Sequence, residues 1–290
     1  MLELSTITTI DFHVTSRCNQ ECAYCWGPQD SSQELDRHAA ISIVRKIAAS
    51  SARRIVFTGG DPLQREDIGL LIRLANELNL EVALSTTGDE LHSGFLRAYG
   101  RWIGLISLPL DGSCEEISSL TKKAGHFTAI MHDLEILTEH PNIDVKVATP
   151  VTRHNLGDML NIIKLLKTIA SRMPNRFFYN VFQAFPRSVE KQSWDDLIVS
   201  NEEFQQLKQT IELDPPSFRV NWLDHETLDR LYVMIFPDGR LTIPSGSEYV
   251  DFGPFLEITD LESIIDSSDF DRAKHKRHSK GWSRSAQPGS

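Results

Sequence analysis

Short apolar segments alternate with amphipathic segments over the first 185 residues of the chain. Apolar runs rich in β-branched and aromatic residues predict strands, and the segments between them repeat apolar residues at helical spacing. The predicted strands are residues 7–15, 54–58, 80–85, 102–110, 143–149 and 176–183. The predicted helices are residues 34–51, 66–78, 91–99, 126–140 and 156–171. Strands and helices that alternate in this way predict an α/β fold of six parallel βα units.

The pattern changes after residue 185. A helix is predicted over 202–213, and residues 232–243 predict a hairpin that turns at Pro237-Asp238-Gly239. Residues 274–290 are first basic and then low in complexity, so we expect a flexible tail. These features divide the chain into a core, residues 1–185, and a C-terminal extension, residues 186–290.

Composition narrows the possible functions. The 290 residues are 40% hydrophobic and 24% charged, with a formal net charge of −10, as in an ordinary globular protein. A net negative charge argues against nucleic-acid binding through a broad basic face. No run approaches the roughly 20 apolar residues of a membrane span, and the first residues do not resemble a signal peptide. With four cysteines and no disulfide pattern, we expect a cytoplasmic protein without a membrane partner.

Three of the four cysteines lie together in a C-x3-C-x2-C pattern, directly after the first predicted strand. Cys18, Cys22 and Cys25 supply three of the four ligands that a cubane iron–sulfur cluster or a tetrahedral zinc ion takes. No cysteine follows until Cys114. Three protein ligands leave one position open for chemistry. A zinc site completed by a histidine, such as His13 or His38, is the structural alternative.

With an aromatic residue, Tyr24, before its third cysteine, this loop resembles the cluster loop of radical S-adenosylmethionine (radical SAM) enzymes. Most of the chain resembles viperin-like members, including the cluster loop, Ser107, Lys146 and Val181-Phe182-Gln183. Its hairpin resembles a SPASM extension that lacks cluster cysteines. The resemblance implies a partial (β/α)6 TIM-like barrel with a [4Fe–4S] cluster on Cys18, Cys22 and Cys25. In this family, reductive cleavage of S-adenosylmethionine gives a 5′-deoxyadenosyl radical that abstracts hydrogen. An electron donor such as flavodoxin or ferredoxin is also implied.

The same resemblance implies which residues contact S-adenosylmethionine. A Gly-Gly-Asp-Pro turn follows the second predicted strand, and hydroxyl-bearing residues end or occupy the next two strands. A basic residue follows the fourth strand, and an apolar pair lies in the sixth. The implied contacts are Tyr24, Gly59, Gly60, Asp61, Pro62, Ser85, Thr87, Ser107, Lys122, Val181 and Phe182. An ordinary turn, satisfied loop hydroxyls and a solvated lysine are the structural alternatives.

Polar residues within apolar strands are candidates for the substrate site, because buried polar groups cost free energy unless they are paired. His13, Lys146 and Asn180 are such residues. Alternation with Val145 and Val147 predicts that Lys146 faces the barrel interior, where an ammonium group needs an anion. We therefore expect a phosphate or carboxylate of the substrate beside Lys146.

The predicted activity is hydrogen abstraction from a small molecule, nucleotide or sugar-like. Viperin-like enzymes dehydrate a nucleoside triphosphate, but Asn180 stands where they are expected to carry a phosphate-binding lysine. Ala148 likewise stands where an asparagine is expected. A peptide or other natural-product precursor is the alternative substrate. A non-catalytic metal-binding or redox-sensing protein is the alternative of another class.

Overall fold

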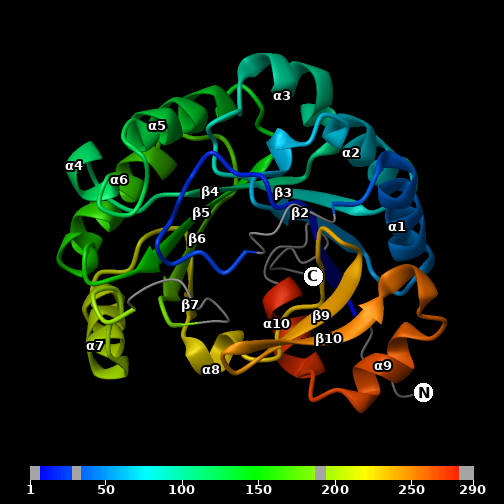
Figure 1. Cartoon of the computed structure of the whole chain (residues 1–290). Coiled ribbons are helices and arrows are strands. Elements are labelled where there is room, and N and C mark those ends of the chain that lie inside the picture. Colours follow the sequence, from blue (N-terminus) through cyan, green and yellow to red (C-terminus); the bar gives the residue numbers. More distant parts are fainter. Residues whose placement is uncertain (1–6, 28–33, 187–193, 281–290) are drawn as a thin grey trace, which may run out of the picture.

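The computed structural model of the protein describes residues 7–27, 34–186 and 194–280. One curved sheet runs through this part of the chain, and Figure 1 shows its strands in an arc with helices around the outside. The strand order is β10-β9-β8-β1-β2-β3-β4-β5-β6-β7. Adjacent strands from β1 to β7 are parallel. The predicted α/β fold of parallel units is therefore confirmed.

The six predicted strands all form, and amphipathic helices connect them. The strands are β1 (Thr9–Thr15), β2 (Arg54–Gly59), β3 (Glu81–Ser85), β4 (Leu105–Pro109), β5 (Asp144–Val151) and β6 (Phe177–Gln183). The helices between them are α1 (Arg37–Ala49), α2 (Ile68–Glu77), α3 (Ser93–Tyr99), α4 (Glu115–Ser118), α5 (His126–Leu137) and α6 (Met159–Ala170). Helix α4 was not predicted, and short 3-10 turns at 62–64, 100–102 and 156–158 complete the connections.

Alternation along each strand decides which side chains enter the core. In β1, Ile10, Phe12 and Val14 are at most 1% exposed and pack against the surrounding helices. Helix α1 buries Ile43, Val44 and Ile47 against them at helical spacing, and its N-terminus is capped by the Asp36 side chain. The residues that alternate with this apolar set, such as Asp11 and His13, face the interior of the barrel.

The C-terminal extension continues the same sheet at both of its edges. Strand β7 (Arg219–Leu223) pairs in parallel with β6, and β8 (Met234–Ile235) pairs in parallel with β1. The predicted hairpin forms between β8 and β9 (Arg240–Ser245), with Gly239 at a φ of +84° in its turn. Neither β7 nor the antiparallel β10 (Glu248–Pro254) was predicted. The remaining elements are α7 (Asn201–Glu212), α8 (His225–Leu228), the 3-10 turn 255–257, α9 (Leu261–Ser267) and α10 (Arg272–Lys280).

Helix α10 closes the end of the barrel at which the strands begin, on the inner side of the arc in Figure 1. His275 Nε2 accepts hydrogen bonds from the backbone N–H of Thr8 (3.0 Å) and Thr9 (3.2 Å). Its Nδ1 donates to the Leu231 carbonyl at 2.9 Å. The Thr9 hydroxyl donates to Ser279 at 3.1 Å. The expectation of a flexible tail from residue 274 is therefore wrong for 274–280; residues 281–290 lie outside the described residues.

None of the helices in the described part of the chain combines the length and the apolar character needed to cross a membrane.

Replacing His275 tests how α10 is held. His275→Leu leaves two backbone N–H groups and one carbonyl without their partner, so we expect the free energy of unfolding to fall by about 2–4 kcal/mol. Arg277→Leu, an exposed position on the same helix, should change it by less than about 0.5 kcal/mol. Urea unfolding at pH 7.5 or so measures both variants. Equal unfolding midpoints for wild type and His275→Leu would contradict this role.

The stability difference between wild type and His275→Leu should depend on pH. Burial lowers the pKa of His275 from 6.5, so the folded protein keeps it neutral while the unfolded chain takes up a proton. Its stabilising contribution is complete above pH 6.5 and declines as the pH falls below that value. The stability difference between wild type and His275→Leu should therefore shrink from pH 7.5 to 5 or so. A difference that grows on acidification would show the opposite sign of the shift.

Candidate active site

Two adjoining cavities occupy the barrel. The cysteine cavity, about 580 Å³, lies where the strands end and is lined by Cys18, Cys22 and Cys25. The barrel cavity, about 320 Å³, lies below it and is lined by the inward-facing residues of the strands. Trp26, Gly27 and Phe182 line both. A reactive species formed in the first cavity would thus face the second across these three residues.

The cysteine loop presents its thiols to one cavity. The Cys25 N–H donates to the Cys22 carbonyl at 3.1 Å, and the Gln20 N–H donates to Cys18 Sγ at 3.4 Å. Burial raises the pKa of Cys18 to about 11, and the neighbouring Cys22 and Cys25 add to this rise. Lys122 Nζ lies 3.0 Å from Cys22 Sγ, where its positive charge opposes the effect of burial on the pKa of Cys22. This charge favours the thiolate that iron requires.

Neither histidine named for a zinc site lines the cysteine cavity. In the described ranges, no three His, Cys, Asp or Glu side chains come together as the ligands of a single metal ion do. His13 lies in the barrel cavity, and His38 is exposed on α1. A cubane cluster, by contrast, spaces its thiolates more widely than one ion, because each cysteine binds a different iron atom.

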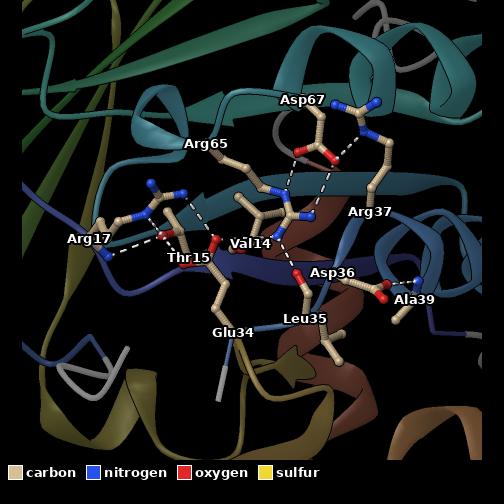
Figure 2. Close-up of polar contacts among 10 residues, drawn as sticks. All are labelled: Val14, Thr15, Arg17, Glu34, Leu35, Asp36, Arg37, Ala39, Arg65 and Asp67. Atoms are coloured by element: carbon tan, nitrogen blue, oxygen red, sulfur yellow. Dashed lines mark hydrogen bonds and ion pairs between the residues drawn. The ribbon is translucent and has the colours of Figure 1, made fainter. Parts of the chain in front are cut away.

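A buried arginine, Arg65, ties the two ends of the loop together (Figure 2). Its Nη1 donates to the Val14 carbonyl at 2.9 Å, before the loop, and to the Leu35 carbonyl at 3.0 Å, after it. Asp67 receives hydrogen bonds from Nε at 2.7 Å and Nη2 at 3.3 Å. Arg65 is 4% exposed, so its charge depends on this carboxylate and on the neighbouring Glu34.

Glu34 extends this network to the residue before the first cysteine. It accepts hydrogen bonds from the Thr15 hydroxyl at 2.6 Å and from Arg17 Nη2 at 3.1 Å. The Thr15 hydroxyl in turn accepts the Arg17 N–H at 3.1 Å. The backbone entering the cysteine loop is thus fixed by both charge and hydrogen bonding.

The Gly-Gly-Asp-Pro turn packs directly against this loop. Gly60 N donates to the Thr15 carbonyl at 2.8 Å, and Asp61 N donates to the Arg17 carbonyl at 2.7 Å. A Cβ atom on Gly60 would lie 2.2 Å from the Arg17 carbonyl oxygen. Gly59 has a φ of +141°, and a Cβ there would lie 2.2 Å from the Thr15 carbonyl oxygen. The expected need for close backbone approach is met, but the nearest partner is the cysteine loop itself.

Asp61 organises the next turn. It is fully buried, and it accepts hydrogen bonds from the Thr86 and Thr87 hydroxyls, each at 2.7 Å. Burial raises the pKa of Asp61, and these two hydrogen bonds lower it. Pro62 begins the 3-10 turn that the Asp61 side chain caps. The Thr87 hydroxyl, predicted to contact S-adenosylmethionine, thus holds Asp61, although Thr87 still lines the cysteine cavity.

Tyr24 and Lys122 are joined by a residue that was not predicted, Asp111. The Tyr24 hydroxyl donates to Asp111, and so does the Thr121 hydroxyl at 2.7 Å. Lys122 Nζ lies 5.4 Å from the centre of the Tyr24 ring. Asp111 has no exposed surface, and its negative charge raises the pKa of Lys122. The only feature of the sequence that could have indicated Asp111 as a site residue is its position directly after the fourth strand.

The other predicted contacts divide between the two cavities and the core. Phe182 lines both cavities, whereas the side chain of Val181 is fully buried in the hydrophobic core. Ser85 and Ser107 line the barrel cavity and not the cysteine cavity. The structure therefore places these two hydroxyls at the barrel cavity, although they were predicted to contact S-adenosylmethionine.

The barrel cavity brings together the three residues predicted for the substrate site. His13, Lys146 and Asn180 all line it. His13 is 6% exposed, and neither of its ring nitrogens has a hydrogen-bond partner in the described part of the chain. Burial lowers its pKa to about 4, so the ring is neutral. Asn180 Oδ1 accepts a hydrogen bond from Asn221 at 2.9 Å.

Residues from outside the predicted set complete this cavity. Asp11 and Arg54 line it from β1 and β2, and His278 lines it from α10. Tyr249 of β10 also lines it, and its hydroxyl donates to the Trp26 carbonyl at 2.8 Å. Sequence reasoning missed Tyr249 and His278 because they reach the site only through the folding of the extension.

Comparison with known proteins decides the family. The family model described as "Radical SAM superfamily" matches residues 12–170, more than half of the chain. The chain belongs to the radical SAM superfamily. Enzymes of this superfamily use a [4Fe–4S] cluster and S-adenosylmethionine, so the predicted family, cofactors and catalytic nature are confirmed.

Relatives and solved structures agree with this family. An "S-adenosylmethionine-dependent nucleotide dehydratase" of Lacinutrix mariniflava is 26% identical, over 90% of this chain and 56% of the relative. The relative with the same description from Flammeovirga pacifica is 26% identical, over 87% of this chain and 88% of its own. The structure "Native anSMEcpe with bound AdoMet and Kp18Cys peptide" superposes with a TM-score of 0.67 at 14% identity, covering 95% of this chain and 84% of that one. The last likeness establishes the shared barrel fold.

Gly60→Ala tests the contact between the turn and the loop. The added methyl group would overlap the carbonyl oxygens of Ser16 and Arg17, so we expect the protein to lose at least about 2 kcal/mol of stability. Iron retained after anaerobic reconstitution should fall with it. Gly157→Ala is the matched control, because nothing lies within 4 Å of a Cβ there. Wild-type iron content and stability in Gly60→Ala would refute the contact.

Arg65→Lys tests the tie across the loop. An ammonium group cannot reproduce the forked contact with Asp67 together with both carbonyl contacts, so we expect a loss of about 2–4 kcal/mol of stability. Arg73→Lys, whose side chain is 53% exposed, serves as the control and should change stability by less than about 0.5 kcal/mol. Thermal or urea unfolding measures both. Equal effects of the two substitutions would remove Arg65 from this role.

Proposed function

We propose that this protein initiates radical chemistry on a small molecule, nucleotide-like or sugar-like, held inside the barrel. Cys18, Cys22 and Cys25 hold the [4Fe–4S] cluster, and the open coordination position receives S-adenosylmethionine. The bound pair supplies a 5′-deoxyadenosyl radical. The observation that carries this proposal is the adjacency of the two cavities, which share Trp26, Gly27 and Phe182.

The chain's own residues bind and orient the reactants. The Gly59–Pro62 turn and Lys122 shape the methionine end of the cysteine cavity, with Lys122 placed to pair with a carboxylate. Tyr24 and Phe182 offer apolar surface to the adenosyl group. Asp111 fixes both Tyr24 and Thr121, so it positions the tyrosine and the lysine that follows Thr121. Phe182 and Trp26 also separate the radical from solvent.

His13 and Asn180 contact the substrate in the barrel cavity. His13 supports this role most directly, because its buried imidazole has no hydrogen-bond partner among the described residues to offset the cost of burial. A substrate hydroxyl or amide would satisfy it. Ser85 and Ser107, on neighbouring strands, provide further hydroxyl groups at the same cavity.

A dehydration related to that of viperin-like enzymes, on a substrate other than a nucleoside triphosphate, is the finer form of this proposal. It is supported by the two nucleotide dehydratases to which the chain is similar over most of its length. The chain spans only about half, 56%, of the Lacinutrix relative. Flavodoxin or ferredoxin is the proposed electron donor.

A peptide substrate is the second candidate. The solved structure with a bound peptide has the same fold. The antiparallel β8–β9 hairpin supports the resemblance to a SPASM extension that lacks cluster cysteines. The barrel cavity favours the small molecule, because α10 closes its far end and its volume is only about 320 Å³. That volume lies at the lower end of the range for small-molecule sites.

Cysteine substitution tests the proposed activity. After anaerobic reconstitution, we expect about four irons per chain and 5′-deoxyadenosine on reduction in the presence of S-adenosylmethionine. Cys18→Ala, Cys22→Ala and Cys25→Ala should each lose both, because two thiolates hold a cubane cluster poorly. Cys114→Ala, an exposed cysteine before α4, should keep both. Stoichiometric zinc without cleavage of S-adenosylmethionine in the wild type would refute the proposal.

A further inference from the structure

Among the described residues, the Asp, Lys and Arg side chains that line the barrel cavity are Asp11, Arg54 and Lys146. Asp11 of β1 and Lys146 of β5 both line it. Burial raises the pKa of Asp11 to about 7 and lowers the pKa of Lys146 to about 8, and the charge of each group opposes the shift of the other. Arg54, at the floor, donates to Glu81 at 2.6 Å. The described lining therefore offers two cations, of which Lys146 shares the cavity with the Asp11 carboxylate and Arg54 pairs with a carboxylate outside the lining.

The remaining polar lining is neutral. His13 and His278 are held uncharged by burial, which lowers their pKa values to about 4 and about 3. Thr58, Ser85, Ser107 and Asn180 add hydroxyl and amide groups. The cavity thus offers many hydrogen-bonding groups and little net charge.

We infer that the substrate is a small polar molecule with at most one negative charge, and that Asp11 neutralises Lys146 and so excludes nucleoside triphosphates. This inference rests on the proposed function, since it concerns the molecule held in the same cavity. This inference replaces the expectation that a substrate phosphate is the partner of Lys146.

The physical reason is the cost of burying unmatched charge. A triphosphate brings several negative charges, which a closed cavity accepts only beside a matching number of cations. Here the Asp11 carboxylate would repel the phosphates from the place where Lys146 attracts them. A hydroxyl-rich or amide-bearing molecule meets no such repulsion and can hydrogen-bond to His13.

The floor of the cavity adds a steric limit in the same direction. Helix α10 places His275, His278 and Ser279 across it, and its contacts to Thr8 and Thr9 hold it there. A phosphate chain could therefore not extend through the bottom of the barrel. It would have to lie alongside Asp11 or return toward Phe182.

The test measures how the reconstituted full-length enzyme binds inorganic triphosphate, with S-adenosylmethionine present, by anaerobic equilibrium dialysis. The variants are Asp11→Asn, Asp11→Asn with Lys146→Met, and the control Glu116→Gln, which removes one exposed carboxylate elsewhere. Asn keeps the shape of Asp, and circular dichroism with urea unfolding confirms that each variant folds. Cytidine, uridine, adenosine and guanosine triphosphates are dialysed in parallel.

We expect wild type and Glu116→Gln to bind inorganic triphosphate with a Kd above about 1 mM. Asp11→Asn should bind it at least about tenfold more tightly, because the carboxylate that repels phosphate beside Lys146 is then removed. The Lys146→Met double variant should lose that gain. Micromolar binding of inorganic triphosphate or any of the four nucleotides by the wild type would overturn the inference, as would an unchanged Kd in Asp11→Asn. Absence of 5′-deoxyadenosine on reduction would instead refute the proposed function. The dialysis would still measure triphosphate binding, because binding does not require radical formation.

Discussion

The junction between the end of β1 and the end of β2 is the constraint on which the site depends. Two backbone hydrogen bonds, from Gly60 to Thr15 and from Asp61 to Arg17, hold the turn against the start of the cysteine loop. Only residues without a Cβ fit there, because the carbonyl oxygens of Thr15 and Arg17 lie where side chains would begin. The Arg65 guanidinium then joins the end of β1 to Leu35 at the far end of the loop. The positions of the cysteines are therefore set by backbone contacts outside the cysteine motif.

The core of the fold could be predicted because its signals are local. Buried strands such as Ile10-Asp11-Phe12-His13-Val14 carry their period in adjacent residues, and α1 and α6 carry strong helical spacing. The local pattern did not predict strands β7 and β10, since β7 is largely half-buried and β10 is largely exposed. Their pairing depends on β6 and β9, which a local pattern cannot reveal. Helix α10 was missed because its buried face is polar.

Helix α10 shows why polarity alone is a poor guide to disorder. Its sequence is strongly basic, and that composition predicted a flexible tail. His275 and Ser279 are nevertheless at most 6% exposed, because each satisfies backbone or hydroxyl groups at the start of β1. The basic residues lie on the remaining faces. Similarly, the cysteines could be identified from spacing, whereas Asp111 and Tyr249 could not, since their partners lie 87 and 223 residues away.

Strand geometry separates the lining of the cysteine cavity from that of the barrel cavity. Residues at the ends of β1 to β6 and in the loops that follow form the cysteine cavity, and inward-facing residues within the strands contribute most of the barrel cavity. Because side chains alternate, Lys146 and Ala148 can change without moving Val145 or Val147, which pack outward into the core. The charge inside the barrel can thus differ among enzymes that share the cysteine loop. Asp11 shows how this works: it lies between Ile10 and Phe12 of the core, and its charge reaches Lys146 across the barrel.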